Sequence, residues 1–563
     1  MMTSEIEPKK KYRLDDIFTD LVGELGCYQI WMFFFLGIMS FTGVELIYTN
    51  FTALAVPHVC HVPELANLTF EEQQYVIAPV KKDGLHSYSQ CEKFDFNYSS
   101  YSSADLKHWN RTEELKKHHP KVVPCSSYVF NDKAFKHSIV EEWLLVCGNQ
   151  WLVDLVSTIT VAGCFVGAFL GGAIADRYGR RKGLLACNVV KLVGNVGAIF
   201  APDYYAFCVA RALVGFGSTS TYLIAFVLLV ELVGSSYRNS VGIGFSILYS
   251  LGFMYLPLAA FLTKDAFLFQ TAVVAPMLLS VSYFCLLPES PRWLLLRERR
   301  PEVLKILRAI GKTNGRPLSP DFGVDDVISL AGNSRKQEKS TICDIFATPV
   351  IRKRSFILCF DWFTVSLIFY ALSLNAGNLV GNIYLNTFLL GVVEIPAGLI
   401  AIWSVNVNSI GRRWTHVVAF AIAGLSLLAC VPVIETEKVL WLSTVFAMIG
   451  KSGSSAAFNG LYLYTSELYP TQVRNLGMGV CSAMARISGM VASYAGGSLQ
   501  QVWAPLPSLL FGSLGTLSAL ATVLLPETLH TTLPETVAQV EDTAFTQRKN
   551  LDDDEQPLLH DTD

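Results

Sequence analysis

The chain has 563 residues, of which 52% are hydrophobic and only 16% are charged. Soluble globular proteins carry about 25% charged residues, so a chain of this length with so few charges is expected to lie in lipid rather than in water. Its 44 Lys and Arg residues nearly balance its 47 Asp and Glu residues. This balance gives no bias toward an anionic surface, and no nucleic-acid partner is expected.

Continuous apolar segments run through most of the chain. A helix needs about 20 mostly apolar residues to cross a bilayer, and runs of this length exclude the alternating pattern of barrel strands. The sequence therefore predicts an all-α membrane protein, without a signal peptide because residues 1–27 are polar. The twelve predicted transmembrane helices are 28–49, 150–172, 183–201, 204–230, 239–262, 267–287, 355–375, 381–404, 415–434, 439–465, 477–499 and 504–525.

The distribution of basic residues predicts the orientation, because Lys and Arg near span ends favour the cytoplasmic side. Residues 173–182 contain four of them and residues 291–354 contain fourteen, whereas residues 202–203 and 500–503 contain none. We therefore expect a multi-pass plasma-membrane protein with both termini in the cytoplasm. Its predicted parts are a cytoplasmic N-terminus (1–27), the first span (28–49), an extracellular domain (50–149), spans two to six (150–287), a cytoplasmic linker (288–354), spans seven to twelve (355–525) and an acidic cytoplasmic tail (526–563).

The long connection between the first two spans has the features of an extracellular domain. All four Asn-x-Ser/Thr sequons of the chain lie in it, and sequons in a luminal loop are glycan acceptors. Its four cysteines allow three disulfide pairings in an oxidising compartment. The predicted acceptors are Asn50, Asn67, Asn97 and Asn110, and the predicted disulfide cysteines are Cys60, Cys91, Cys125 and Cys147.

Three short patterns occur twice, at offsets of 232 to 238 residues. The corresponding segments are Asp176-Arg177-Tyr178-Gly179-Arg180-Arg181 and Asn408-Ser409-Ile410-Gly411-Arg412-Arg413, Glu231 with Arg238 and Glu467 with Arg474, and Pro288-Glu289 and Pro526-Glu527. Three matches in register indicate that six spans are repeated in the same orientation, as in transporters built from two halves.

These patterns resemble those of a known family. Gly172-x-x-x-Asp176-Arg177-x-Gly179-Arg180-Arg181 resembles the signature of the major facilitator superfamily, and Pro288-Glu289-Ser290-Pro291-Arg292 is similar to sugar-porter-like and organic-ion carriers. The cysteine-bearing loop, Val393-Glu394-Ile395-Pro396 and Glu467-Leu468-Tyr469-Pro470 resemble the organic cation, zwitterion (carnitine) and anion transporter family. The resemblance implies transport of a small organic ion, with no enzymatic activity and no cofactor. It leaves open whether a coupling ion, Na⁺ or H⁺, takes part.

Alternating access requires contacts that form in one state and break in the other, while the two halves rock around a central site. Arg and carboxylate groups at the cytoplasmic span ends suit such a gate. The alternative is that the basic residues only set the topology and bind lipid headgroups. The predicted gating residues are Asp176, Arg177, Arg180, Arg181, Glu231, Arg238, Arg412, Glu467 and Arg474.

Charges in the middle of spans indicate a binding site, since each costs at least ~2.5 kcal/mol unless it faces a cavity or a partner. Lys191, Glu394 and Arg486 are the first candidates, and Asp361 and Lys451 are further ones. Arg486 suits a substrate carboxylate, and Glu394 suits an ammonium group. Each charge has an alternative role in a salt bridge between helices. The aromatic residues expected to contact a substrate cation are Tyr222, Trp362 and Tyr370.

The branch of the family is implied by two of these positions. Cation-selective members typically have aspartate where this chain has Arg486, whereas anion and carnitine carriers have arginine. Glu394 matches cation and carnitine carriers, and Gly398 stands where anion carriers tend to have lysine. The resemblance thus implies a carrier of zwitterions or cations, such as carnitine-like betaines, β-amino acids or amine conjugates. The alternatives are an organic anion exchanger of the same fold and a non-transporting membrane receptor or scaffold.

Other motifs add little. The sequence contains no Gly-x-x-x-x-Gly-Lys-Ser/Thr phosphate loop and no His/Cys set with metal-ligand spacing, so neither ATP-driven pumping nor a metal site is expected. In the tail, Asp554-x-x-x-Leu558-Leu559 resembles an acidic dileucine sorting signal, which implies a clathrin adaptor as a partner.

Overall fold

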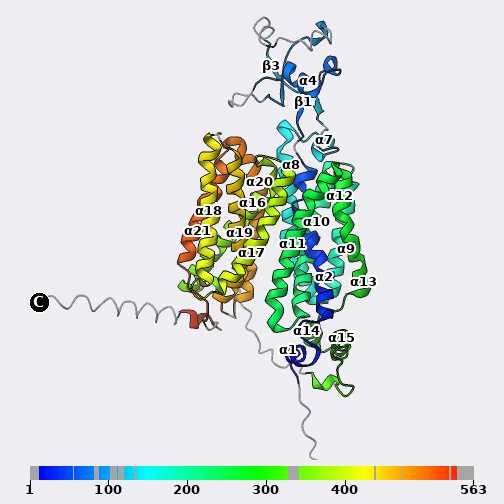
Figure 1. Cartoon of the computed structure of the whole chain (residues 1–563), viewed down its shortest axis with the longest axis vertical. Coiled ribbons are helices and arrows are strands. Elements are labelled where there is room, and N and C mark those ends of the chain that lie inside the picture. Colours follow the sequence, from blue (N-terminus) through cyan, green and yellow to red (C-terminus); the bar gives the residue numbers. More distant parts are fainter. Residues whose placement is uncertain are drawn as a thin grey trace, which may run out of the picture.

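The computed structural model describes residues 12–541, apart from 55, 81–87, 102–110, 112–119, 132–134, 328–341, 437–438, 471, 532–533 and 535. Two helical bundles lie side by side, with a small domain at one end (Figure 1). We call that end the loop-domain end. The opposite end, which carries helices α14 (Pro291–Leu296) and α15 (Arg300–Thr313), is the linker end. The sequon at Asn110 and the sorting signal at Asp554, Leu558 and Leu559 lie outside the described residues.

Each bundle contains the helices of one predicted half. The first half consists of α2 (Cys27–Phe41) with the 3₁₀ turn Thr42–Leu46, α8 (Trp151–Tyr178), α9 (Arg180–Ile199), α10 (Tyr204–Glu231), α11 (Arg238–Thr263), and α12 (Ala266–Val274) continued through a 3₁₀ segment into α13 (Tyr283–Leu286). The second half consists of α16 (Pro349–Leu374), α17 (Ile383–Val405), α18 (Gly411–Thr436), α19 (Trp441–Leu468), α20 (Arg474–Val502) and α21 (Leu506–Val523).

Eleven helical segments of the described residues are long and apolar enough to cross a membrane. They coincide with eleven of the twelve predicted spans. The remaining span, 439–465, corresponds to the 28-residue helix α19, whose buried residues include Ser, Thr and Gly together with Lys451. Residues that face other helices instead of lipid need not be apolar, so α19 completes the predicted arrangement of twelve helices.

The two halves contact each other toward the loop-domain end. Ser250 of α11 donates a hydrogen bond of 3.0 Å to Glu394 of α17. Asn50 of the short helix α3 (Thr49–Thr52) donates one of 2.6 Å to the carbonyl of Ser373 in α16. Toward the linker end, the apolar clusters of the described residues contain residues of one half only. The halves are therefore joined at the loop-domain end and packed separately at the linker end.

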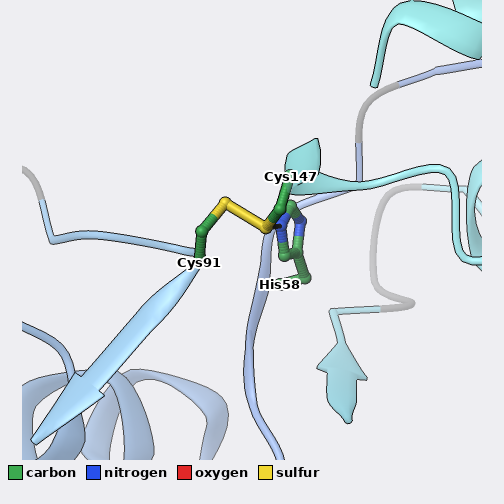
Figure 2. Close-up of side chains that lie close together, drawn as sticks. All are labelled: His58, Cys91 and Cys147. Atoms are coloured by element: carbon green, nitrogen blue, oxygen red, sulfur yellow. Dashed lines mark hydrogen bonds between the residues drawn. A yellow bond between two sulfur atoms is a disulfide. The ribbon is translucent and has the colours of Figure 1, made fainter. Parts of the chain in front are cut away.

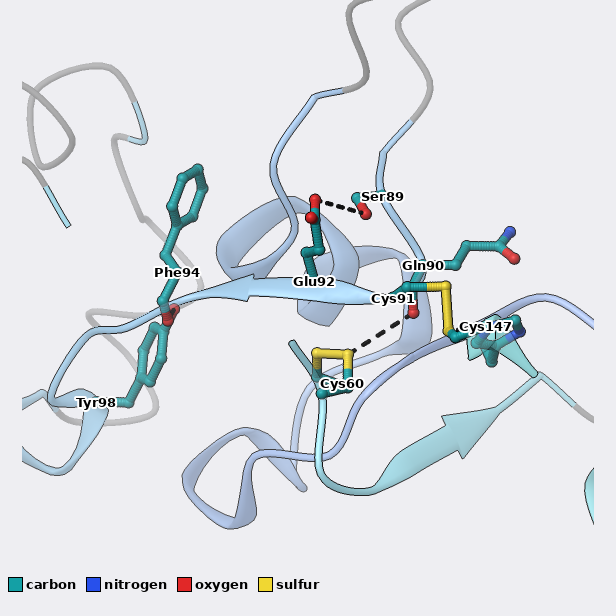
Figure 3. Close-up of a disulfide and its surroundings, with 10 residues drawn as sticks. Cys60, Ser89, Gln90, Cys91, Glu92, Phe94, Tyr98 and Cys147 are labelled. Atoms are coloured by element: carbon teal, nitrogen blue, oxygen red, sulfur yellow. Dashed lines mark hydrogen bonds between the residues drawn. A yellow bond between two sulfur atoms is a disulfide. The ribbon is translucent and has the colours of Figure 1, made fainter. Parts of the chain in front are cut away.

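Two disulfides hold the described part of the loop domain together (Figure 3). They join Cys60 to Cys125 and Cys91 to Cys147, which selects one of the three pairings that the sequence allows. Strand β1 (His58–Cys60) pairs with β4 (Tyr128–Phe130), and β2 (Glu92–Phe94) pairs with β3 (Val122–Pro124), both antiparallel. Such short strands bury little apolar surface, so the cross-links supply much of the domain's stability.

One group in this domain brings three metal-ligating residue types together. Ligand atoms of His58, Cys91 and Cys147 lie within 4.8 Å of one another (Figure 2). The two sulfur atoms are bonded to each other, and only a thiolate is a good metal ligand. While the disulfide is intact, the group offers a metal ion the imidazole of His58 alone.

The predicted glycan acceptors differ in their surroundings. Asn67 and Asn97 are exposed on the loop domain, whereas Asn50 is half-buried between the two halves, where its amide binds the Ser373 carbonyl. A glycan on Asn50 would break this hydrogen bond and collide with the second half. The structure therefore favours an unmodified Asn50, because helical structure continues past the predicted end of the first span and places this residue between the halves.

We expect Asn50→Gln to leave the glycan mass of the expressed protein unchanged, and Asn67→Gln and Asn97→Gln each to remove one glycan. Gel mobility before and after peptide-N-glycosidase digestion measures this. A shift for Asn50→Gln as large as that for Asn67→Gln would contradict the placement of Asn50.

Candidate functional site

The repeated charged residues form one network in each half, at the linker end. In the first half, Arg180 pairs with Asp176, and its Nη2 lies 3.4 Å from Oε1 of Glu231. In the second half, Nε of Arg412 lies 3.2 Å from Oε2 of Glu467. Arg180 thus has two carboxylate partners, whereas Arg412 has one, because the sequence replaces the first copy's aspartate with asparagine in the second copy.

A glutamate caps one helix in each network. Oε1 of Glu289 accepts a hydrogen bond of 3.1 Å from the backbone amide of Arg181 at the start of α9. Glu527 accepts two from the amides of Arg412 and Arg413 at the start of α18, at 2.8 and 3.0 Å. Unpaired amides and the helix dipole make such a helix start attractive to an anion. The residues that are repeated in the sequence therefore make the same kind of contact in both halves.

The glycine of each repeat makes room for this carboxylate. Gly179 and Gly411 have φ angles of +106° and +72°, which other residues rarely adopt. A Cβ atom at either position would collide with the side chain of Glu289 or Glu527, respectively. Both the backbone conformation and the close approach therefore require glycine.

Two further predicted gating residues, Arg238 and Arg474, begin α11 and α20. Arg238 pairs with Asp15 at 2.5 Å, and Arg292 of α14 pairs with the same carboxylate at 2.5 Å. Asp15 lies in α1 (Leu14–Asp16) and so connects the N-terminal segment to the linker. Nε of Arg474 donates a hydrogen bond of 3.3 Å to the carbonyl of Tyr469.

The last two predicted gating residues have backbone and ring contacts. The guanidinium of Arg177 lies 5.5 Å from the ring centre of Tyr178, and Nη2 of Arg181 donates to the carbonyl of Phe284 at 2.8 Å. Among the described residues, every ion pair of the predicted gating residues joins groups of the same half. In this conformation the networks stabilise each half and do not connect one half to the other.

Lys191, predicted as a substrate ligand, has an internal partner. Its Nζ lies 3.6 Å from Oε1 of Glu45, and both side chains are fully buried. Arg211 of α10 completes this group, since it donates to the Glu45 carbonyl at 2.7 Å and lies 4.3 Å from the ring centre of Tyr48. The structure places Lys191 in a closed cluster of the first half. Sequence reasoning missed Arg211, although its position within the fourth predicted span was a sufficient signal.

Glu394, the predicted ammonium ligand, also has a partner. Its Oε1 lies 2.8 Å from Nζ of Lys451, whose side chain is fully buried. The ammonium group of Lys451 lies 3.1 Å from the ring centre of Phe369, and Ser250 donates to the other carboxylate oxygen. Glu394 is therefore neutralised inside the protein in this conformation.

Arg486 of α20 differs from the other mid-span charges. No carboxylate of the described residues lies within ion-pair distance of it, and its side chain is half-buried. It lies near Tyr462 and Tyr370, and Tyr370 in turn is near Tyr222. The ring centre of Tyr249 lies 6.2 Å from that of Tyr222. We call these five residues the arginine–tyrosine cluster.

The arginine–tyrosine cluster lies between the halves. The first half contributes Tyr222 and Tyr249 from α10 and α11, and the second contributes the other members from α16, α19 and α20. All five side chains keep accessible surface, and Tyr462 is 38% exposed. A guanidinium without a carboxylate, surrounded by aromatic rings, can bind a carboxylate and an adjacent cation or apolar group.

Trp362 lies behind this cluster. It is fully buried, its Nε1 donates a hydrogen bond of 2.9 Å to Thr465, and its ring meets Tyr462 edge-on at 4.5 Å between ring centres. It therefore positions Tyr462 instead of facing a substrate. Sequence reasoning missed Tyr462, although it lies eleven residues after Lys451 and so on the same face of the helix.

Comparisons with known proteins agree with this architecture. Residues 89–538 match the family model described as "Sugar (and other) transporter". The "Organic cation transporter protein" of Drosophila melanogaster is 31% identical over 543 residues, covering 93% of each chain. "Solute carrier family 22 member 1" of Oryctolagus cuniculus is 32% identical and covers 94% of this chain and 95% of its own, and the human member 2 is 31% identical over 92% and 93%.

Solved structures show a similar fold. The inward open conformation of the xylose transporter XylE from E. coli superposes with a TM-score of 0.54 at 16% identity, over 70% of this chain and 90% of that one. A crystal structure of a D-xylose-proton symporter gives a TM-score of 0.54 at 16% identity, over 89% and 99%. At this identity the likeness concerns the fold alone.

The cap formed by Glu527 predicts a pH-dependent stability. Burial alone would raise the pKa of Glu527, but amide hydrogen bonds, including those from Leu529, Arg412 and Arg413, outweigh burial and lower the pKa below its ordinary value of 4.5. The stabilisation is thus present above pH 4.5 and is lost as the pH falls through the folded-state pKa. We expect Glu527→Gln to lower the Tm of the purified protein at pH 7, through loss of about 1.5–3 kcal/mol.

The Tm difference between wild type and Glu527→Gln should shrink as the pH falls below 4.5. The exposed Glu435 offers a matched control, and Glu435→Gln should leave the Tm unchanged. A Tm deficit of Glu527→Gln that is the same at every pH would contradict the assigned cap.

Proposed function

We propose a substrate class for this chain, which belongs to the sugar (and other) transporter family and, within it, to the solute carrier 22 transporters. It is a multi-pass membrane transporter of small organic ions and not an enzyme. Its proposed substrates are small organic zwitterions or cations of the betaine type, which it carries across the plasma membrane by alternating access. The observation that carries the proposal is the half-buried Arg486, which has no carboxylate partner among the described residues.

Arg486 supports the carboxylate part of the substrate class. A guanidinium binds a carboxylate through two parallel hydrogen bonds. Because Glu394 is neutralised by Lys451, the charge available at the cluster is that of Arg486. A substrate carboxylate would therefore meet a positive site that the protein itself leaves without a counter-charge.

The aromatic rings support the cationic part. A quaternary ammonium group gains about 0.5–2 kcal/mol over a tyrosine ring face within about 6 Å, and Tyr222, Tyr249 and Tyr370 belong to the same cluster as Arg486. A betaine of a few carbon atoms carries both a carboxylate and a quaternary ammonium group. The Drosophila melanogaster relative named "Organic cation transporter protein" supports a cation as part of the substrate.

The same arrangement supports a direction of access. The halves are joined at the loop-domain end and packed separately at the linker end, so we assign the structure to a state accessible from the linker side. The basic residues of that side support its placement in the cytoplasm. The hydrogen bond from Ser250 to Glu394 crosses between the halves and would break when the loop-domain end opens. The exposed Asp176 and Arg177 would then form contacts with the other half.

An organic anion exchanger is the second candidate. The observation that favours it is the same excess positive charge of Arg486. In that case a substrate needs a carboxylate but no ammonium group, and the aromatic rings contact its apolar part.

Three labelled compounds of one shape separate these substrate classes. γ-Butyrobetaine carries both charges, butyltrimethylammonium lacks the carboxylate, and 5,5-dimethylhexanoate replaces the ammonium nitrogen with carbon. We expect wild-type uptake of γ-butyrobetaine in expressing cells. Arg486→Ala should reduce this uptake at least tenfold, which corresponds to about 1.4 kcal/mol, and should leave butyltrimethylammonium uptake within about twofold.

The control is Arg486→Lys, which keeps the charge but loses the paired geometry and should retain intermediate uptake. Equal loss of γ-butyrobetaine and butyltrimethylammonium uptake in Arg486→Ala would eliminate the zwitterion proposal. Wild-type uptake of 5,5-dimethylhexanoate alone would establish the anion exchanger, and uptake of none of the three would favour a scaffold.

The ion pair between Glu394 and Lys451 generates a further prediction. Removing one partner leaves a buried charge uncompensated, at a cost of about 3–5 kcal/mol. We therefore expect Glu394→Gln and Lys451→Met each to lower the Tm and the surface expression. The double variant should recover most of the lost Tm, since no charge is then unpaired. Additive losses in the double variant would contradict a direct pair.

A further inference from the structure

Asp361 of α16 is a fully buried carboxyl group in the second half. No Lys, Arg or His of the described residues lies within ion-pair distance of it. From α21, the hydroxyl group of Thr522 lies 3.0 Å from Oδ2 of Asp361, and that of Ser518 lies nearby. The titratable groups near Asp361 are Tyr464 of α19 and Cys481 of α20. The side chains of Thr522 and Ser518 are fully buried as well. The substrate site described above does not use this group.

The hydrogen bonds around Thr522 determine where a proton must lie. Its Oγ1 lies 2.7 Å from the carbonyl of Ser518, one turn earlier in α21, and 3.0 Å from Oδ2 of Asp361. A hydroxyl group has one proton and can donate to only one of these oxygens. Serine and threonine in helices commonly donate to the carbonyl one turn back. If Thr522 donates its proton to the Ser518 carbonyl, a hydrogen bond between Thr522 and Asp361 requires a proton on the carboxyl group.

A neutral carboxylic acid completes this arrangement. Its O–H group donates to Oγ1 of Thr522, which in turn donates to the Ser518 carbonyl. An ionised carboxylate would have no cation, and its second oxygen, Oδ1, has no hydrogen-bond partner. A buried charge in these surroundings is strongly unfavourable. This arrangement favours the protonated acid over the anion.

Two further buried side chains, Tyr464 and His416, lie on the linker side of Asp361. Tyr464 faces Asp361 and donates a hydrogen bond of 2.8 Å to the carbonyl of Pro526, next to the capping residue Glu527. The imidazole of His416 is fully buried and stacks on the Tyr464 ring at 5.0 Å between ring centres. These groups line the side of the second half from which the proton would leave.

We propose that Asp361 carries a proton in this conformation and that transport is coupled to the exchange of this proton with the solution at the linker end. In the exchange the O–H bond of Asp361 breaks, a water molecule accepts the proton, and the carboxylate regains a proton in a later step of the cycle. The coupling part rests on the proposed transport function. The protonation of Asp361 does not, and the two parts are tested separately.

Infrared spectra of the purified wild type, from which the spectra of variants are subtracted, test the protonation of Asp361 without any substrate. We expect the C=O stretching band of a protonated carboxylic acid in the wild type at neutral pH and its absence in Asp361→Asn. Glu394→Gln, which alters a paired carboxylate, should retain the band. In Thr522→Val the band should move to higher frequency, because the acid loses its acceptor. Identical spectra of wild type and Asp361→Asn would overturn the protonation.

Proteoliposomes test the coupling with labelled γ-butyrobetaine. We expect a pH difference across the membrane to change wild-type uptake at least threefold. Asp361→Asn should show no response to this difference but keep counterflow, which requires no net movement of protons. An unchanged response in Asp361→Asn, or wild-type uptake that follows a sodium gradient and ignores the pH difference, would overturn the coupling. If the wild type moves no substrate while the infrared band is present, the proposed transport function fails and the protonation stands.

Discussion

A charge inside a bilayer has no water to solvate it, and this constraint determines how the mid-span charges of the chain are arranged. Lys191 is paired with Glu45, and Lys451 is paired with Glu394. Each pair joins two helices of the same half. The charges that the sequence predicts as binding residues, Lys191 and Glu394, therefore serve mainly to stabilise each half internally. Arg486 and Asp361 have no ion-pair partner among the described residues, and neither does Arg211, whose guanidinium contacts the Glu45 carbonyl and the Tyr48 ring. For Arg486 and Asp361, a substrate or a proton must account.

At the linker end, which is closer to water, the charged residues are also paired within each half. Each half has an arginine paired with a glutamate, and a second glutamate that caps a helix start at a glycine with positive φ. These contacts connect the ends of helices that are distant in sequence and so make each half a unit. Two units of this kind, whose described contacts with each other lie toward the loop-domain end, can rock against each other without loss of their internal contacts. In this conformation the repeated motif thus stabilises each half, and the described contacts between the halves lie elsewhere.

Much of the fold was predictable because it depends on local patterns. Apolar length identified the spans, the repeated motifs identified the two halves, and the four loop cysteines are all paired. Side-chain partners were not predictable, since they depend on how each helix is rotated and which helix lies beside it. Trp362 and Tyr370 lie on the same helix, yet the first is buried behind Tyr462 and the second belongs to the arginine–tyrosine cluster. Asn50 satisfies the sequon pattern, but its contact with Ser373 depends on a helix more than 300 residues away.

Helix α16 connects two groups that have no ion-pair partner among the described residues. Asp361 is followed directly by Trp362, whose ring lies against Tyr462, and Tyr462 lies near Arg486. A substrate carboxylate that pairs with Arg486 would therefore bind beside Tyr462. Two sites influence each other when both bias one element with two arrangements. In the proposed cycle that element is α16, because its rotation moves Trp362 and Asp361 together and changes both the support of the substrate site and the access of water to the carboxyl group.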